Sequence, residues 1–80
     1  MKILVIENAK KILNLIKRGL EESKFEVNMA SDGESGVQMM MQGSYNLVVL
    51  DAELPKRDGL SIVKELRARK IMVPILMLSE

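Results

Sequence analysis

The hydrophobic residues of this chain follow two different spacings, which predict two kinds of secondary structure. Short, mainly apolar runs lie at residues 3–6, 46–50 and 73–79, as expected for strands that are buried on both faces of a parallel sheet. Residues 25–30 alternate apolar and polar side chains instead. This alternation predicts a strand with one solvated face, at the edge of the sheet.

Between these runs, apolar residues recur every three or four positions, which predicts three helices. The first runs from Ala9 to about Lys24, with Asn8 as its N-cap. The second covers residues 34–42, and the third covers 59–70 with Asp58 as its N-cap. The buried faces are expected to consist of Ile12, Leu13, Ile16 and Leu20 in the first helix, Val37, Met40 and Met41 in the second, and Leu60, Val63 and Leu66 in the third.

The predicted element order is β-α-β-α-β-α-β, which indicates the α/β fold class. Strands and helices that alternate at this spacing form a parallel sheet with right-handed crossovers and helices on both faces. The 80 residues are enough for one domain, residues 1–80. Such a domain buries only about 60% of the surface that its unfolded chain exposes, so we expect marginal stability.

Composition narrows the possible chemistry. The chain contains no histidine and no cysteine, which excludes disulfides and the commonest metal ligands and leaves carboxylates, hydroxyls and lysines. The net charge of +1 offers little attraction to nucleic acid or to a membrane surface. No apolar stretch approaches the roughly 20 residues that cross a bilayer, and the N-terminal apolar run is too short for a secretory signal. We therefore expect a cytoplasmic protein with no direct nucleic-acid or membrane partner.

Polar side chains directly follow three of the predicted strands: Glu7 and Asn8, Asp51, and Ser79. Neighbouring parallel strands end at the same edge of a sheet, about 4.8 Å apart, so Glu7, Asp51 and Ser79 are expected to share one crevice. Oxygen ligands without histidine or cysteine suit Mg²⁺, and a carboxylate beside Mg²⁺ can attack a phosphoryl group. Taken singly, Asp51 and Ser79 are also acceptable as ordinary polar residues at the ends of strands.

Five segments, taken together, closely resemble the receiver domain of two-component response regulators. They are KILVIEN at the N-terminus, LVVLD, Leu54-Pro55, Asp58-Gly59 and VPILMLS. The resemblance extends over all 80 residues and implies a flavodoxin-like fold, Mg²⁺ as cofactor and a sensor histidine kinase as partner. It implies a signalling domain rather than an enzyme. An enzyme acting on a small molecule is also disfavoured because no glycine-rich phosphate loop follows the first strand.

The resemblance also implies roles for individual residues. Asp51 matches the aspartate that accepts a phosphoryl group. Glu7 and Asn8 match the acidic pair that holds Mg²⁺ together with Asp51, and Glu53 matches the residue whose backbone carbonyl ligates the metal. Ser79 matches the hydroxyl residue that bonds the phosphoryl oxygen.

Three features depart from the family pattern. Asn8 stands where the family has a second acid, so we expect weak Mg²⁺ binding unless the Glu53 side chain supplies the missing charge. Glu80 follows Ser79 where a small residue is usual, and its charge is expected to hinder an approaching phosphate. The sequence also ends before the fourth helix, fifth strand and fifth helix of the family, and before the lysine that clamps the phosphoryl group.

For a receiver domain truncated in this way, we expect impaired phosphotransfer. The fourth strand would form an apolar sheet edge that can pair with another chain. We therefore expect a homodimer, formed through this strand or through exchanged elements. The alternative function is a self-associating interaction module without phosphotransfer.

Overall fold

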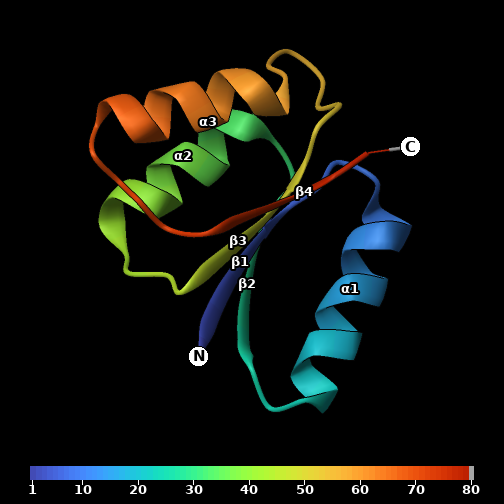
Figure 1. The fold of residues 1–80 in the computed structure, drawn as a ribbon. Coiled ribbons are helices and arrows are strands. Elements are labelled where there is room, and N and C mark those ends of the chain that lie inside the picture. Colours follow the sequence, from blue (N-terminus) through green and yellow to red (C-terminus); the bar gives the residue numbers. More distant parts are fainter. Residues whose placement is uncertain (80) are drawn as a thin grey trace.

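The computed structural model describes residues 1–79 as strands and helices that alternate along the chain (Figure 1). This is the predicted element order, and it forms an α/β, flavodoxin-like fold. Glu80, whose charge was expected to hinder a phosphate, lies outside the described residues. Among residues 1–79, no helix has both the length and the apolar character needed to span a bilayer. In chain order the elements are β1 (Lys2–Ile6), α1 (Lys10–Glu22), β2 (Glu26–Ala30), α2 (Gly33–Gln42), β3 (Leu47–Asp51), α3 (Gly59–Ala68) and β4 (Ile75–Leu78).

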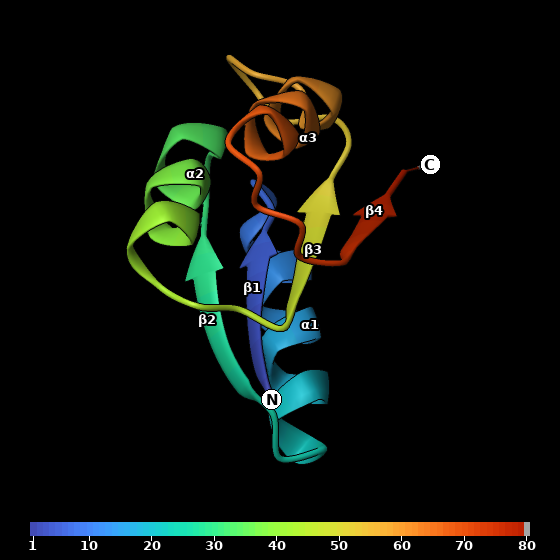
Figure 2. The same cartoon turned by 60° about the vertical axis from the view of Figure 1, so that its left-hand side comes forward.

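The strands form one parallel sheet in the order β2-β1-β3-β4 (Figure 2). β1 and β3 are central, and β2 lies at an edge, as its alternating pattern predicted. Because β1, β3 and β4 are neighbours, their carboxyl ends meet at one edge of the sheet. The register places Asp51, the last residue of β3, opposite Leu78 of β4.

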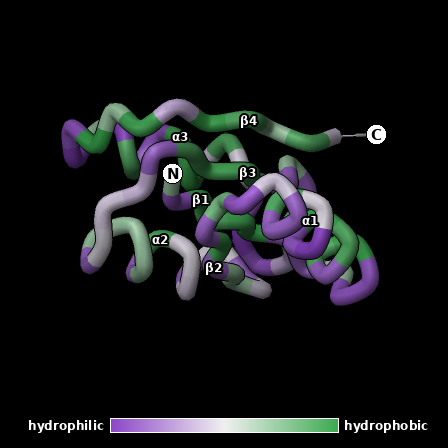
Figure 3. The backbone as a smooth tube through the Cα atoms, turned by 90° about the horizontal axis from the view of Figure 1, so that it is seen from below, coloured by the Kyte–Doolittle hydropathy of each residue, from purple (hydrophilic) through white to green (hydrophobic). Residues whose placement is uncertain are grey.

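Helices cover both faces of the sheet, with α1 on one face and α2 and α3 on the other (Figures 1 and 2). In Figure 3 the strands are mainly hydrophobic, whereas α1 mixes hydrophobic and hydrophilic residues. Burying one large apolar side chain contributes about 1.5–3 kcal/mol, so these two layers supply most of the driving force for folding. The core under α1 contains Ile3, Val5, Leu13, Val27 and Val49; the core under α2 and α3 contains Leu4, Ile6, Val48, Leu50, Ile62 and Leu66 among others.

A glycine allows α2 to pack closely on β1. A Cβ atom at Gly36 would lie 2.5 Å from Cδ1 of Ile6, which is far inside van der Waals contact. Any larger residue would push α2 away from the sheet. The close approach therefore explains why a residue with poor helix propensity occupies the middle of α2.

Helices α1 and α3 end in the same hydrogen-bonded motif. After α3, the Lys70 N–H donates to the Arg67 carbonyl (2.9 Å) and the Ile71 N–H donates to the Leu66 carbonyl (2.9 Å), which is the Schellman arrangement. Lys70 has a φ of 61°, and Lys24 has a φ of 67° at the same position after α1. Glycine is the residue that adopts this left-handed conformation without steric cost, so both lysines carry some backbone strain.

The predicted helix caps are partly confirmed. Asp58 caps α3, because its carboxylate accepts a hydrogen bond from the Ser61 N–H at 2.8 Å. Asn8 as the cap of α1 is wrong: α1 begins one residue later, and its N-cap is Ala9, which has no side-chain hydrogen bond. The carboxylate of Glu7 accepts from the Ala9 N–H instead, at 3.1 Å.

Three residues that were expected on buried helix faces are exposed: Ile12, Met41 and Leu60. In α3 the buried side chains are Ile62 and Leu66, and Ile62 was missed by the pattern. The sequence pattern of a helix defines each edge of its buried face only to within one residue, because adjacent residues lie about 100° apart around the axis. Packing against the sheet selects which of the apolar residues turns inward.

The pattern-based expectation that residues 73–79 form a strand buried on both faces is wrong, whereas the expectation that this strand forms an apolar sheet edge is confirmed. Leu76 is 55% exposed, and Met77 is exposed too. Within residues 1–79, β4 pairs with β3 alone and its outer edge has no neighbouring strand. The outer half of β4 therefore presents apolar side chains and free backbone groups to solvent.

Candidate functional site

A pocket lies at the carboxyl ends of β1, β3 and β4. Glu7 follows β1 directly, Asp51 ends β3, and Ser79 follows β4, so the parallel sheet brings these three residues to one place. Glu53 from the β3–α3 loop joins them. The pocket is lined by Glu7, Ala9, Ile12, Asp51, Glu53, Leu78 and Ser79.

Asp51 is held at the end of β3 with its carboxylate partly exposed. The Glu53 N–H donates to Oδ1 of Asp51 at 3.0 Å, and the Ala52 N–H donates to the Leu78 carbonyl at 2.8 Å. The first contact orients the side chain, and the second continues the β3–β4 ladder beyond Asp51. An accessible carboxylate held in this way can serve as a nucleophile or as a metal ligand.

Glu7 is a buried acid beside another acid. Its residue is only 5% exposed, and burial raises the pKa of its carboxyl above the usual value, with the neighbouring Asp51 carboxyl raising it further. The hydrogen bond from the Ala9 N–H opposes this rise in pKa by favouring the charged form. Two carboxyl groups in such proximity favour a bound cation, because a positive charge relieves their mutual repulsion.

The donor set of the pocket fits Mg²⁺. The Glu7 and Asp51 carboxylates offer hard oxygen atoms, and Mg²⁺ typically keeps several waters beside one or two carboxylates. No group of three acidic side chains close enough to hold a metal ion occurs within the described residues. The Glu53 carboxylate therefore does not join those of Glu7 and Asp51 in this arrangement.

Ser79 and Asn8, both predicted as site residues, differ in their position relative to the pocket. Ser79 is exposed and lines the same pocket as Asp51. Asn8 is exposed and is not among the lining residues. The structure thus brings together four of the five predicted site residues and leaves Asn8 outside.

Three apolar contributors to the pocket were missed by sequence reasoning. Ala9, Ile12 and Leu78 form part of its wall. Ile12 was assigned to the helix core from its spacing, but it lies in the first turn of α1 and lines the pocket together with Glu7. Its place at the start of α1 was the available indication that it could reach the site.

Comparison with known proteins identifies the family of this chain. The model of the response regulator receiver domain family matches residues 3–80. The chain is 44% identical over 78 residues to the alkaline phosphatase synthesis transcriptional regulatory protein PhoP of Bacillus subtilis, covering 98% of this chain and 32% of PhoP. The chain thus spans about a third of the length of the curated relatives that it matches.

Solved structures agree with this result. The receiver domain of Francisella response regulator 1452 superposes with a TM-score of 0.95 at 35% identity, covering 98% of this chain and 64% of that one. The response regulator TrrA of Thermotoga maritima in complex with Mg²⁺ and BeF has a TM-score of 0.90 at 34% identity, covering 95% of this chain and 66% of that one. TrrA is also similar in its complex with the histidine kinase ThkA, with a TM-score of 0.90 at 35% identity over 98% of this chain and 67% of that one. This chain therefore belongs to the response regulator receiver domain family.

Proposed function

We propose that residues 1–80 act as one receiver unit in which Asp51 accepts a phosphoryl group from a phosphohistidine of a sensor histidine kinase. The observation that carries this proposal is the placement of the partly exposed Asp51 carboxylate in the same pocket as the buried Glu7. An oxygen of Asp51 attacks phosphorus, the new O–P bond forms, and the P–N bond to histidine breaks. The histidine nitrogen keeps the electron pair and takes up a proton from solvent. The chain is then a covalent acceptor rather than an enzyme.

Each residue of the pocket has a role in this step. The Glu53 N–H holds Oδ1 of Asp51 and so orients the carboxylate for attack. Glu7 and Asp51, with the carbonyl of Glu53, would hold Mg²⁺, which neutralises the negative charge of the incoming phosphoryl group when it is bound. Ser79 would donate its hydroxyl hydrogen to a phosphoryl oxygen. Asn8 contributes no charge, and this supports weak Mg²⁺ binding.

A histidine kinase partner is supported by the TrrA–ThkA complex, in which a similar receiver is bound to a kinase. The similarity of TrrA with bound Mg²⁺ and BeF supports Mg²⁺ as the cofactor. Neither complex identifies the kinase that acts on this chain. The chemistry at Asp51 is therefore best tested without a kinase.

The test uses a small phosphodonor, acetyl phosphate, with the intact mass of the protein as the readout. We expect one phosphoryl adduct that requires Mg²⁺ and disappears in Asp51→Asn. Asp58→Asn is the matched control, since it changes an acid of the same loop that caps α3, and it should still be labelled. Wild-type protein that remains unlabelled with Mg²⁺ present would refute the proposal.

A second candidate function, self-association, is favoured by the exposed edge of β4. The residues of β4, Ile75–Leu78, include no charged side chain and no proline, whereas natural edge strands usually carry charges or prolines that block pairing with other chains. A second copy of this chain could pair along β4, or exchange elements, and bury Leu76. A homodimer of this kind needs no phosphotransfer.

Light scattering across a range of protein concentrations tests self-association. We expect the mass of a dimer for wild type and of a monomer for Leu76→Lys, which places a charge on the edge. Leu60→Lys is the control, because Leu60 is 57% exposed, similar to the 55% of Leu76, but lies on α3. A wild-type monomer at every concentration would exclude this candidate.

A further inference from the structure

The loop between β3 and α3 positions the backbone of Glu53 beside Asp51, and it is anchored at both of its ends. The Gly59 N–H donates to the Ala52 carbonyl at 2.9 Å, which closes the loop. Leu54 is buried in the core under α2 and α3. Between these anchors, Lys56 is exposed and has a φ of 68°. Its side chain therefore does not anchor the middle of the loop to the core.

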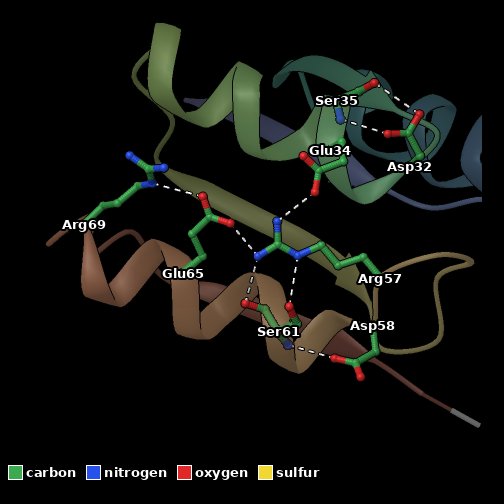
Figure 4. Close-up of polar contacts among 8 residues, drawn as sticks. All are labelled: Asp32, Glu34, Ser35, Arg57, Asp58, Ser61, Glu65 and Arg69. Carbon is green, nitrogen blue, oxygen red and sulfur yellow. Dashed lines mark hydrogen bonds and ion pairs between the residues drawn. The ribbon is translucent and has the colours of Figure 1, made fainter.

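Arg57 ties this middle part of the loop to two helices (Figure 4). Its Nε donates to Oγ of Ser61 at 3.0 Å, and Nη2 donates to the Ser61 carbonyl at 3.2 Å and forms an ion pair with Glu65 of α3. Nη1 bonds Oε1 of Glu34 in α2 at 2.9 Å. All three nitrogens of one guanidinium are therefore engaged, two with α3 and one with α2.

The contact with α2 is close as well as polar. A Cβ atom at Gly33, the first residue of α2, would lie 3.6 Å from Cβ of Arg57 and 2.8 Å from Cδ1 of Ile62. The start of α2 thus packs directly on the stem of Arg57 and on α3. Among the hydrogen bonds and ion pairs of residues 1–79, the contact between Arg57 and Glu34 is the side-chain link from this loop to α2.

The ion pair between Arg57 and Glu65 is more shielded from solvent than an ordinary surface ion pair, which contributes little to stability, whereas the side chain of Glu34 is 71% exposed. The side chain of Arg57 is 19% exposed and that of Glu65 is 27% exposed, and Glu65 is also bonded by Nε of Arg69 at 3.0 Å. The paired guanidinium groups hold the pKa of Glu65 below its usual value, so the carboxylate stays charged. The planar guanidinium loses little further freedom as it makes several bonds in one plane.

We propose that Arg57 is a positioning residue that locks the β3–α3 loop between α2 and α3 and thereby fixes the Glu53 backbone beside Asp51. The link to the metal and phosphoryl chemistry rests on the function proposed above, whereas the locking of the loop does not. Without the guanidinium, residues 55–57 would lose their side-chain links to α2 and α3. Motion of this segment would reach Glu53 through the adjoining Leu54 and loosen the hydrogen bond from the Glu53 N–H to Oδ1 of Asp51.

The test compares Arg57→Met, which keeps the aliphatic stem, with Arg69→Met, which removes the other cation bound to Glu65. The first readout is the NMR order parameter of the backbone amides of Glu53, Leu54, Lys56 and Arg57 without metal. We expect values to fall from about 0.85, typical of rigid backbone, to below about 0.6 in Arg57→Met. In Arg69→Met they should remain as in wild type. Amide exchange in β1 verifies that each variant stays folded.

The second readout is Mg²⁺ affinity, followed through the amide shifts of Asp51 and Glu53. Loss of a residue that orients metal ligands typically weakens binding by about 10-fold or more, and this is the effect expected for Arg57→Met alone. Arg57→Lys keeps the charge but loses the planar set of donors. It should therefore bind Mg²⁺ less tightly than wild type, which a role of charge alone does not predict.

Order parameters that stay unchanged in Arg57→Met, or that fall equally in Arg69→Met, would overturn the positioning role. Equal Mg²⁺ affinity of Arg57→Met and wild type would overturn the link from the loop to the site. A mobile loop in Arg57→Met, combined with wild-type protein that binds no Mg²⁺, would support the positioning role and count against the proposed function. The two failures are thus distinguishable.

Discussion

Gly59 lies directly against the backbone of Asp51, so that a Cβ atom at position 59 would be 2.8 Å from the Asp51 carbonyl oxygen and 2.9 Å from Cα of Ala52. The first residue of α3 and the last residue of β3 are therefore packed without space for a methyl group. This contact places the start of α3 at the end of the strand that carries the candidate nucleophile. The geometry of the pocket depends on it.

Replacement of this glycine should disturb both stability and site. We expect Gly59→Ala to lower the free energy of unfolding by about 1–3 kcal/mol, the usual cost of forcing an extra methyl group into a packed region. Gly19→Ala is the control, because a Cβ there meets nothing within 4 Å and alanine favours a helix by about 1 kcal/mol. Urea unfolding of both variants measures the difference, and a Gly59→Ala protein as stable as wild type would contradict the close packing.

The strained lysines at the ends of α1 and α3 offer a stabilising change. We expect Lys70→Gly to raise the free energy of unfolding by about 0.5 kcal/mol, since relief of a left-handed φ exceeds the entropy that glycine adds to the unfolded chain. Lys24→Gly should act in the same direction. Lys64→Gly, inside α3, should instead lower it by about 0.5–1 kcal/mol. Thermal unfolding of the three variants measures these differences, and a destabilised Lys70→Gly would show that the left-handed conformation carries no net strain for lysine.

Two acids with lowered pKa values should make the fold sensitive to acid. The Ser35 N–H and hydroxyl lower the pKa of Asp32 at the start of α2, and Arg57 and Arg69 lower that of Glu65. A carboxyl with a lower pKa in the folded state contributes stability above its unfolded pKa, and this contribution is lost as the pH falls through the folded pKa. We expect the free energy of unfolding to fall as the pH drops below about 5 and through the folded pKa of each acid.

Asp32→Asn and Glu65→Gln should each flatten this part of the stability curve, because the substituted side chains do not titrate. Urea titrations at several pH values provide the measurement. Glu26→Gln serves as a control, since Glu26 is exposed and its salt bridge to Lys2 is long, at 3.9 Å. If the free energy of unfolding of Asp32→Asn depends on pH as steeply as that of wild type, Asp32 does not contribute to the acid sensitivity.

Glu7 should have the opposite effect on stability. Its pKa is raised in the folded state by burial and by Asp51, so its charged form destabilises the fold as the pH rises from the unfolded pKa through the folded one. We expect Glu7→Gln to be more stable than wild type at neutral pH in the absence of divalent cations. Addition of Mg²⁺ should raise the melting temperature of wild type and leave that of Glu7→Gln almost unchanged. Equal responses of the two proteins to Mg²⁺ would exclude Glu7 as a ligand.

The arrangement of the site was accessible from the sequence because it depends on local pattern and on one property of parallel sheets. Four-residue apolar runs located β1 and β3, and a polar residue after each run marked where the strand ends. Since parallel strands end at one edge, the sequence alone predicts that Glu7, Asp51 and Ser79 lie together. Asn8 shows how far this reasoning extends: it also follows β1, but the chain turns into α1 at Ala9, and Asn8 faces solvent outside the pocket.

The sequence by itself determined the order of the elements, the edge position of β2 and the residues that end the strands, because each of these follows from spacing over a few residues. Only the tertiary structure decided which apolar residue of a helix turns inward, as in Ile62 rather than Leu60, since the stripe on an isolated helix does not define its own boundary. Only the tertiary structure brought Arg57 to Glu34, 23 residues away along the chain. Such a contact depends on how α2 and α3 pack side by side on the sheet, and no local pattern encodes that arrangement.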